Sequence, residues 1–459
     1  MGKKIFFFLF LLISIIASAQ INQLPIIKLT GQFSNDYQTG TVNLYLPDGT
    51  SQEQLETSIK WRGGTTNTEN THKRNYTIKF SEDQQFFGLR KDNKWILDAG
   101  NADVFRLRNK IATELWNDMA HKPYYANQEP KALSGVRSQV VEVYLNDEYM
   151  GIYSLMENMD RKQLKLKKYN KETGEIRGGL WKAIGWGNTM MWDCEPYDNH
   201  SDTWGEFEVK YPELDDVPET DYSTLYNAID FVINSSDADF ISHINEYFDM
   251  PVVIDYYIFL YVLNAYDNRG KNMYWAVYDK TQDKKLTIAV WDLDCSVGQR
   301  WIDQILPNSS APDYPFADYL NIYYRLSQLN ADAFNEKVLE RYQQLRTTCL
   351  STDSLIKRYQ DYYELLKNTG AAQREEERWS GDSDVRGEEI NFQKEMAYIT
   401  DWITRHMQYL DNYFYSSPTN ISHSTNDIDK YNIYNMNGQR INVPQRGIYI
   451  RNGRKIIIL

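Results

Sequence analysis

Cysteine and histidine are scarce in this chain. Of its 459 residues, three are cysteine and six are histidine. Cys194, Cys295 and Cys349 lie far apart and are odd in number, so neither a disulfide framework nor a zinc-binding spacing is visible, although an exported protein could hold one bridge. The histidines form no HExxH pair. The sequence therefore gives no support to a zinc hydrolase.

Basic residues are too few for a nucleic-acid partner. The chain has 50 lysines and arginines against 63 aspartates and glutamates, and its net charge is −13. Because nucleic-acid binding needs a basic face that neutralises phosphates, this balance excludes such a partner. The acidic residues are spread along the chain, so most of them are expected on the solvated surface.

Long apolar runs are absent after the N-terminus. Lys3 and Lys4 precede an apolar run over residues 5–16, and small residues at 17–19 supply a cleavage site. The run is too short to be a good membrane-spanning helix. We therefore predict a signal peptide over residues 1–19, export of the mature protein, and no transmembrane segment once the signal is removed.

What is present is a clear succession of strand and helix signals. Alternating apolar residues predict strands early in the chain, and apolar residues at helical spacing predict helices. The region 177–218, rich in Gly, Trp, Asp and Asn, is interpreted as an insertion with a rim or lid role, and 374–388 as a charged linker. The expected strands lie within 24–48, at 59–62 and 75–80, and in a hairpin at 140–158; the expected helices are 104–119, 222–233, 237–246, 250–263, 331–366 and a long one ending near residue 414.

The most informative stretch runs from residue 261 to residue 298. Asp267 is followed by Asn272, and a strand-like run then leads to a doubled acid, Asp292 and Asp294. Protein kinases use this order: an Asp that orients the substrate hydroxyl, an Asn that binds metal, and a later Asp that holds the metal at the ATP phosphates. Carboxylates and one amide suffice, because phosphoryl transfer is mostly positioning and charge neutralisation.

Each of these residues has an expected role and a structural alternative. Asp267 is the candidate base for the incoming hydroxyl, or else a loop acid that caps a turn. Asn272 and Asp292 offer hard oxygen ligands to Mg²⁺ or Mn²⁺, and Asp294 is either a further ligand or an acceptor for loop amides. The structural alternative for Asp292 and Asp294 is a buried carboxylate at the end of a strand that forms an ion pair with a basic residue. Asp292 is placed first because it follows the apolar strand.

Several motifs in a fixed order cover most of the mature chain. They are WRGG, the basic strand at 73–80, LRNKIATELWNDM, VEVYLNDEYMGIYSLMENMDR, the Asp267 loop, WDLDCSVG and the long closing helix. This set resembles the CotH kinase family, the spore-coat CotH-like atypical protein kinases. The resemblance covers residues 61–414 and implies an α+β, bilobal, kinase-like fold, with a β-rich N-lobe up to about residue 158, a helical C-lobe over 159–414, and nucleotide between them. Residues 20–60 form an N-terminal β segment.

The resemblance also implies a nucleotide-binding set. Lys79, in the strand before the first helix, stands in the place of the kinase lysine that neutralises ATP phosphates, and Glu114 in that helix could pair with it. An exposed lysine and a solvated glutamate are the alternative. Arg62, Gly63 and Gly64 could bring a guanidinium and backbone amides near phosphate, or form a structural turn.

Further residues are expected at the edge of this site. Arg108 is a candidate phosphate ligand or a partner for an acid of the site. Glu157 ends the hairpin where a kinase hinge would meet adenine, through its backbone alone. Trp181, Trp186 and Trp192 either line a substrate groove or pack in the core.

Composition shifts after residue 414. A polar linker over 415–430 leads to short strands at 431–459. Their motifs, YNMNGQRI and GIYIRNGRKIII, resemble the C-terminal sorting signals of type IX secretion substrates, and an ordinary β appendage is the alternative. The resemblance implies a protein released from, or held on the surface of, a Gram-negative cell after passage through the periplasm.

These observations predict a secreted atypical kinase. It would transfer the γ-phosphoryl group of ATP to Ser or Thr of exported or surface proteins, with Mg²⁺ or Mn²⁺. Because ATP is scarce outside cells, it would act in the periplasm before export or use another nucleotide. The alternatives are a catalytically inactive kinase fold that binds protein or glycan, and a hydrolase with a carboxylate pair such as Asp267 and Asp292, which no spacing selects.

Overall fold

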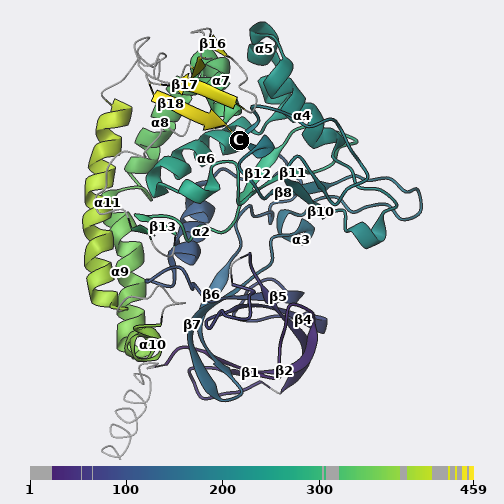
Figure 1. Cartoon of the computed structure of the whole chain (residues 1–459). Coiled ribbons are helices and arrows are strands. Elements are labelled where there is room, and N and C mark those ends of the chain that lie inside the picture. Colours follow the sequence, from purple (N-terminus) through teal and green to yellow (C-terminus); the bar gives the residue numbers. More distant parts are fainter. Residues whose placement is uncertain are drawn as a thin grey trace, which may run out of the picture.

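A computed structural model gives the fold of the chain (Figure 1). It describes residues 23–301 except 53 and 65, residues 304–305, 320–382 and 390–415, and short strands between residues 433 and 458. The predicted signal peptide and almost all of the linker over 415–430 lie outside the described residues.

The early strands close into a barrel, drawn at the bottom of Figure 1. Buried and exposed residues alternate along them, so one face of each strand points into the barrel. The strand order is β1-β2-β3-β4-β5-β7-β6, and β6 pairs in parallel with β1, which leaves no free edge. The bounds are β1 Ile26–Thr30, β2 Gln38–Tyr45, β3 Leu55–Arg62, β4 Asn75–Gln84, β5 Asp92–Asp98, β6 Ser138–Leu145 and β7 Glu148–Met156.

The hairpin predicted around residues 146–147 is confirmed. β6 and β7 pair from Ser138 opposite Met156 to Leu145 opposite Glu148. Asn146 and Asp147 have φ values of 50° and 65°. A two-residue type I′ turn needs positive φ at both positions, and Asn and Asp tolerate it best after glycine. The turn therefore sets the register of the two strands.

A second sheet lies above the barrel in Figure 1 and corrects one interpretation. Its order is β12-β11-β8-β10-β9, with β8 in the middle. The region 177–218 is therefore no insertion, because its strand β8 pairs with β11 on one side and β10 on the other, and Trp181 of β8 is buried. The bounds are β8 Gly179–Ala183, β9 Thr203–Trp204, β10 Phe207–Tyr211, β11 Met273–Val277 and β12 Thr287–Val290.

Helices form most of the remaining structure. The predicted helices at 104–119, 222–233, 237–246 and 250–263 are present as α2, α4, α5 and α6. α6 is buried along its length except at Pro251, as expected for a helix that is apolar all round. The bounds are α2 Arg108–Met119, α3 Arg161–Leu164, α4 Ser223–Asn234, α5 Asp237–Tyr247, α6 Met250–Leu263, α7 Asn321–Leu329, α8 Phe334–Arg346, α9 Thr352–Asn368, α10 Ala371–Trp379 and α11 Phe392–Tyr415.

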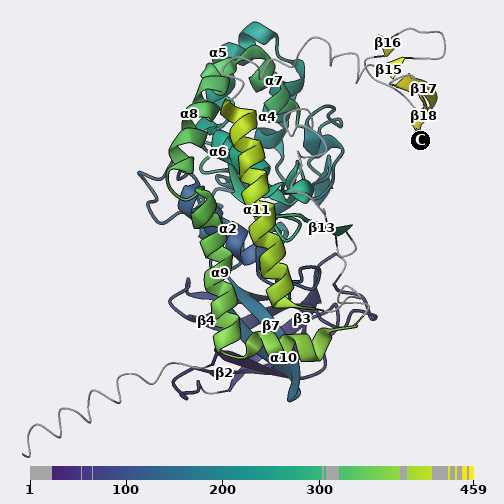
Figure 2. The same ribbon diagram turned by 90° about the vertical axis from the view of Figure 1, so that its left-hand side faces the viewer.

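The chain is helical at residues 371–379, where a linker was predicted in part. The prediction of a charged linker over 374–388 is wrong in its first part, because α10 occupies it. The buried residues of α10 recur at helical spacing, namely Ala371, Ala372, Glu375 and Trp379. In Figure 2, α10 lies at the barrel and α11 runs alongside α9, and α10 packs on β7.

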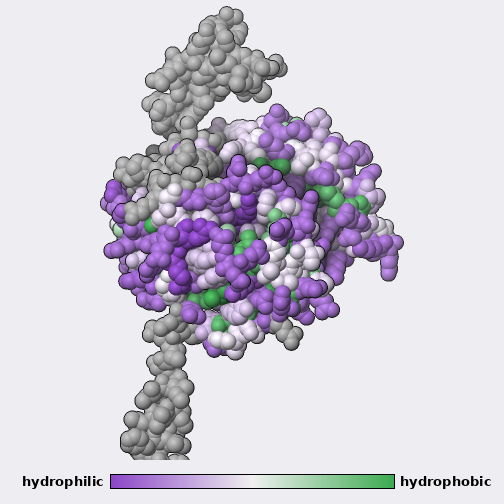
Figure 3. Space-filling view, turned by 60° about the horizontal axis from the view of Figure 1, so that its bottom comes forward, coloured by the Kyte–Doolittle hydropathy of each residue, from purple (hydrophilic) through white to green (hydrophobic). Residues whose placement is uncertain are grey.

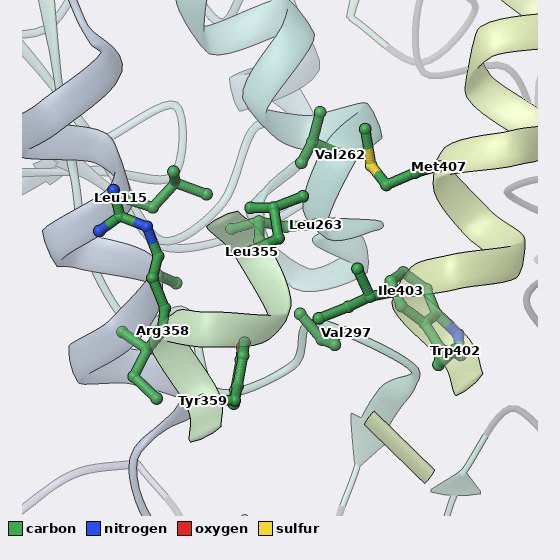
Figure 4. A pocket seen from close by; sticks show the side chains of 12 residues that line it. Leu115, Val262, Leu263, Val297, Leu355, Arg358, Tyr359, Trp402, Ile403 and Met407 are labelled. Carbon is green, nitrogen blue, oxygen red and sulfur yellow. The ribbon is translucent and has the colours of Figure 1, made fainter. Parts of the chain in front are cut away.

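One apolar core continues from the barrel into the helical part. Barrel residues such as Ile59 and helix residues such as Trp116 and Phe259 belong to the same buried cluster, and the rings of the last two pack edge to face at 5.1 Å between centroids. A small cavity between α2, α6, α9 and α11 is lined by apolar side chains, with Arg358 as the charged exception (Figure 4). The face seen in Figure 3 is largely hydrophilic, with small scattered apolar spots.

The predicted α+β class is confirmed. Short strands β13 (Gln299–Trp301) and β14 (Gln304–Ile305) pair after the second sheet. The strands predicted in the tail are also present, as a sheet with the order β16-β15-β17-β18; their bounds are β15 Ile433–Tyr434, β16 Arg440–Ile441, β17 Gly447–Arg451 and β18 Arg454–Ile458. Within the part of the chain that the structure describes, no helix combines the length and apolarity that crossing a membrane requires.

Candidate active site

Asp267 lies on a short 3₁₀ turn, η3 (Tyr266–Asn268), directly after the central helix α6. The helix ends at Asn264, whose left-handed φ of 48° turns the chain. The buried side chain of Asp267 accepts a hydrogen bond from Asn272 Nδ2 at 2.8 Å and lies 3.5 Å from the Lys271 ammonium. Because the amide nitrogen of Asn272 is used here, its oxygen is left for another partner.

Asn272 and Asp292 lie at the same edge of the second sheet. Asn272 precedes β11 and Asp292 follows β12, and the two strands pair with Met273 opposite Val290. The φ values of Asn272 and Asp292 are 52° and 57°. Positive φ is uncommon outside glycine, although Asn and Asp adopt it more readily than other residues, and such backbone clusters at functional sites.

Asn268 fixes the spacing of these two turns. Its side chain is fully buried, and Nδ2 donates to the backbone oxygen of Asn272 at 3.1 Å and to that of Trp291 at 2.8 Å. The Asn268 carbonyl accepts a hydrogen bond from the Tyr256 hydroxyl of α6 at 2.6 Å. The Asn268 side chain therefore holds both left-handed turns together, and its backbone carbonyl ties them to the central helix.

A second asparagine brings the barrel to the site. Asn109 of α2 donates from Nδ2 to Asp98 Oδ2 at 2.7 Å, and its Oδ1 accepts from the Leu293 amide at 3.0 Å. Asp98 ends β5 of the barrel, and Leu293 lies between Asp292 and Asp294. The carboxylate of Asp98 is thereby held next to the doubled acid, although nearly 200 residues separate them in sequence.

The carboxylates of this site repel one another. Burial raises the pKa of Asp267 to about 6, and the charge of Asp292 adds to that rise while Lys271 opposes it. Burial also raises the pKa of Asp98 and, much further, that of Asp294, again with a contribution from Asp292. Asp292 itself is exposed. Carboxylates crowded in this way are stabilised by protonation or by a cation.

The donor set fits a hard divalent cation in its chemistry. Carboxylate oxygens of Asp267, Asp292 and Asp294 and the free amide oxygen of Asn272 are the ligand type that Mg²⁺ and Mn²⁺ prefer. Among the described residues, no three His, Cys, Asp or Glu side chains are already closed around one point. The arrangement therefore supplies the ligand type and the excess negative charge.

Lys182 lies near Asp292, and Lys94 shares with Lys182 the neighbouring charges of Arg62 and Lys210. Burial lowers the pKa of Lys94 on β5 and of Lys182 on β8, and the charges of Arg62 and Lys210 lower both further, while Asp292 opposes the shift at Lys182. Within the described ranges, the ammonium groups of Lys94 and Lys182 have no hydrogen-bonded or ion-paired partner. Such partly buried lysines are suited to bind an anion.

The residues predicted to bind the metal lie close together in the structure. Of the residues predicted to bind the nucleotide phosphates, some also lie at this site. Arg62 reaches the site, with its guanidinium carbon 5.3 Å from the ring centroid of Trp291. Gly63 has φ of 110°, and a Cβ there would lie 2.2 Å from Thr66 Oγ1, so the turn needs glycine. Gly64 has open space around it.

Lys79 and Glu114 do not meet. Lys79 is exposed on β4, and its ammonium lies 6.0 Å from the ring centroid of Tyr37. The Glu114 carboxylate instead accepts hydrogen bonds from Lys110 at 2.7 Å and from the Tyr362 hydroxyl at 2.9 Å. Lys79 alternates with the buried residues Ile78 and Phe80, so the pleat of β4 turns it away from the barrel interior.

The side chains of Arg108 and Glu157 both form ion pairs with other residues of the chain. The Arg108 guanidinium binds Asp103 and Glu395, each at 2.5 Å, and is fully buried, which matches its alternative role as a partner for acids. The Glu157 carboxylate accepts from Arg137 at 2.6 Å, and its backbone amide donates to the Arg137 carbonyl at 3.0 Å. That amide is therefore not left for an adenine ring.

Trp186 extends the site toward solvent. Its ring centroid lies 4.5 Å from the Lys271 ammonium, which in turn lies beside Asp267. Trp186 and Trp192 are 44% and 47% exposed, whereas Trp181 is packed in the core. Core packing therefore applies to Trp181, and a substrate groove at Trp186 and Trp192 stays a prediction.

Sequence reasoning missed Asp98, Asn109, Asn268, Lys94 and Lys182. A signal existed for Asp98, because it ends an apolar strand just before a glycine turn, much as Asp292 ends the strand TIAVW. The asparagines and lysines carried none, since single polar residues in helices and strands are usually solvated. Their roles depend on which strands and helices become neighbours.

The comparisons with known proteins agree with this geometry. No curated protein matches the chain. The family model described as CotH kinase protein matches residues 59–410, a range that begins within β3 and contains every later barrel strand and every residue of the site. This match extends over well more than half of the chain, and we conclude that the protein belongs to the CotH kinase family.

Proposed function

We propose that this protein is a metal-dependent atypical protein kinase of two lobes, which transfers the γ-phosphoryl group of ATP to Ser or Thr of exported or surface proteins. The carrying observation is that Asp267, Asn272 and Asp292 are held together at one edge of the second sheet, where Lys182 of β8, opposite Tyr274 of β11, interacts with the charge of Asp292. Adjacent, partly desolvated groups of opposite charge suit a ligand that is anionic and brings a cation with it. Membership of a kinase family supports the same activity.

Asn272, Asp292 and Asp294 are the residues that would hold Mg²⁺ or Mn²⁺. A bound ion would neutralise negative charge on the phosphates during transfer. Burial raises the pKa of Asp294 most, and the charges of Asp292 and Asp98 add to the rise. A cation would relieve that repulsion, which supports this assignment. The amide oxygen of Asn272 is available because its nitrogen is bound to Asp267.

Asp267 would act on the acceptor hydroxyl. Its carboxylate accepts the hydroxyl proton while the hydroxyl oxygen bonds to the γ-phosphorus and the bond from that phosphorus to the bridging oxygen of ADP breaks. The hydrogen bond from Asn272 fixes the orientation of the carboxylate, and Lys271 lies beside it. Trp186, exposed next to Lys271, lies where the acceptor segment would approach.

Lys182, Lys94 and Arg62 would bind the phosphates, and this role replaces the one expected for Lys79. Lysine binds phosphate as a point charge, and arginine can do so with two hydrogen bonds. Export, periplasmic passage and sorting by the tail over 431–459 remain part of the proposal, supported by the N-terminal and C-terminal sequence motifs.

The experiment is transfer of radioactive γ-phosphate from ATP with Mn²⁺ by the purified mature chain. Asp267→Asn and Asp292→Asn are compared with Asp361→Asn, which removes an exposed carboxylate of α9 that forms an ion pair with Lys357 in its own helix. We expect label on serine or threonine with the parent and with Asp361→Asn, and a loss of at least about 10²-fold with either site variant.

Other outcomes decide against the kinase. Equal labelling by all variants would mean that the label comes from a contaminant. Absence of both label and metal-dependent ATP binding in the parent would leave the inactive binding fold as the better description.

A further inference from the structure

Two arginines at the N-terminal end of α2 bind two helices from the far end of the chain. Arg106 Nε donates to Glu375 of α10 at 2.7 Å, and Arg108 Nη2 donates to Glu395 of α11 at 2.5 Å. Arg106, Arg108 and Glu375 are at most 3% exposed. Buried ion pairs cost much of their attraction in desolvation, so their main value is in fixing geometry.

Arg108 connects α11 to the acidic loop. The guanidinium that binds Glu395 also binds Asp103 at 2.5 Å and lies 3.4 Å from the carbonyl oxygen of Val297. Val297 belongs to the loop that begins at Asp292, and the charge of Asp103 reaches Asp294 in the same loop. The position of Arg108 is therefore transmitted to the carboxylates of the site through one short loop.

α11 also holds the next residue of that loop. The Tyr398 hydroxyl donates to the Gly298 carbonyl at 3.2 Å. Gly298 has φ of 82°, and a Cβ there would lie 2.1 Å from the Tyr398 hydroxyl and 2.7 Å from Trp402 Cδ1. In Figure 4, Val297 lies against Trp402 and Ile403 of the same helix. The end of the loop is thus packed without room to shift.

The other helix is fixed to the barrel. Glu375 of α10 accepts a hydrogen bond from the backbone amide of Ile152 in β7 at 2.7 Å and lies 3.3 Å from the Lys73 ammonium, which is fully buried. A Cβ at Gly151 would lie 2.0 Å from Glu375 Oε2. α10 is therefore held against the same barrel that carries Asp98.

We infer that α10 and α11 form a strap that sets the position of the acidic loop relative to the barrel, and that Arg108 and Glu395 are positioning residues for that loop. Removal of Glu395 would leave Arg108 with Asp103 alone and free the guanidinium to move from Val297. The inference rests on the proposed function for one consequence, the binding of a divalent ion by the loop; the order of the loop itself does not depend on it.

The first test is hydrogen–deuterium exchange of the mature chain, followed over residues 293–300. Glu395→Gln removes the charge, and Tyr398→Phe removes only the hydroxyl and keeps the ring. The matched control is Asp411→Asn, which breaks an Arg–carboxylate pair with Arg346 at 2.7 Å near the other end of α11. We expect about tenfold faster exchange in this loop for Glu395→Gln, a smaller increase for Tyr398→Phe, and no change for Asp411→Asn.

The second test is direct binding of Mn²⁺, without nucleotide or acceptor. Glu395→Gln should weaken it about 10- to 100-fold, as loss of a supporting contact does at metal sites, and Asp411→Asn should not. Unchanged exchange in both Glu395→Gln and Tyr398→Phe, or equal effects in all three variants, would overturn the strap. A parent that binds no Mn²⁺ would count against the proposed kinase, while the exchange data would still decide the positioning role.

Discussion

Asn268 and Asn109 each join segments that lie far apart in the sequence. An asparagine side chain carries a donor and an acceptor on a short stem, so it can bind backbone groups that a longer side chain would push apart. Asn268 joins the turns at Asn272 and Trp291, and Asn109 joins Asp98 to Leu293. At the residue scale, these two amides determine the distances between the carboxylates.

Replacing Asn268 should disturb the site more than the fold. Asn268→Ala removes two hydrogen bonds to buried carbonyls, so we expect the free energy of unfolding to fall by about 2–4 kcal/mol. Asn321→Ala is the control, because Asn321 is also buried and donates to one backbone carbonyl, that of Met191, at 2.8 Å. Urea unfolding gives stability, and labelling from ATP gives activity. If Asn268→Ala and Asn321→Ala are equally stable and lose activity to the same extent, Asn268 does not position the site.

Lys182 and Lys79 are two candidates for binding the ATP phosphates, and the KM for ATP of their variants distinguishes them. Lys182 lies beside Asp292, whereas Lys79 is exposed on the barrel near Tyr37. Lys182→Gln should raise the KM for ATP roughly 10- to 100-fold, since a hydrogen bond to a charged group contributes about 1.5–3 kcal/mol, and Lys79→Gln should leave KM unchanged. Steady-state kinetics at saturating Mn²⁺ measures both. The reverse pattern would restore Lys79 to the site.

At the element scale, α10 is a helix that the sequence-based prediction missed. Its charged composition predicts a linker, yet Glu375 and Trp379 are fully buried against the barrel. The helix forms there because Arg106, Lys73 and the Ile152 amide provide partners for the Glu375 carboxylate. A buried glutamate is tolerable only with such partners.

The docking of α10 requires glycine at position 151. Gly151 has φ of 99°, and a Cβ would lie 2.0 Å from Glu375 Oε2. We expect Gly151→Ala to lower the free energy of unfolding by about 2–4 kcal/mol through this clash and the strained backbone. Gly64→Ala, with no atom within 4 Å of the new Cβ, should be near neutral. Thermal unfolding compares them, and similar melting temperatures would refute the contact.

Asp249, just before α6, makes the stability of the protein depend on pH. Burial raises its pKa from 3.8 to about 6. The folded state binds this proton more tightly than the unfolded chain, so stability present at low pH is lost as pH rises from about 4 to about 6. Asp249→Asn can keep the hydrogen bond from the Tyr124 amide at 2.9 Å.

The variant should therefore be more stable than the parent at pH 7, by up to about 3 kcal/mol, and equal to it near pH 3.5. Urea unfolding at both pH values measures the difference. A difference of the same size at both would show that Asp249 does not titrate as expected.

At the scale of the whole molecule, removal of the tail should leave stability unchanged, whereas removal of the strap should prevent folding. The described strands β15–β18 pair only with one another, so a chain that ends at Tyr415 should melt within about 1 °C of the full chain. A chain that ends at Asn368 lacks α10 and α11, which cover the barrel and α9, and should fail to fold. Calorimetry of the two purified chains checks this. A large loss of stability in the longer chain would place the tail within the core.

Much of the fold and half of the site were predictable from the sequence. The turn residues Asn146 and Asp147 fix their hairpin locally, and the apolar spacing of α2 and α6 predicts each helix within a few residues. Asp267, Asn272 and Asp292 could be found because each sits at the end of a regular element, where a polar residue stands out against an apolar run.

The sequence by itself determined the local elements, the turns and the acids of the two loops, because neighbouring residues decide backbone preference and periodicity. Only the tertiary structure decided the closure of the barrel, the central place of β8, and the approach of Asp98 and Lys182 to the loops. Pairing partners in a sheet are chosen by long-range packing, and a buried charge is acceptable only when distant groups compensate it. Neither of these two conditions can be inferred from residues that are neighbours in the sequence.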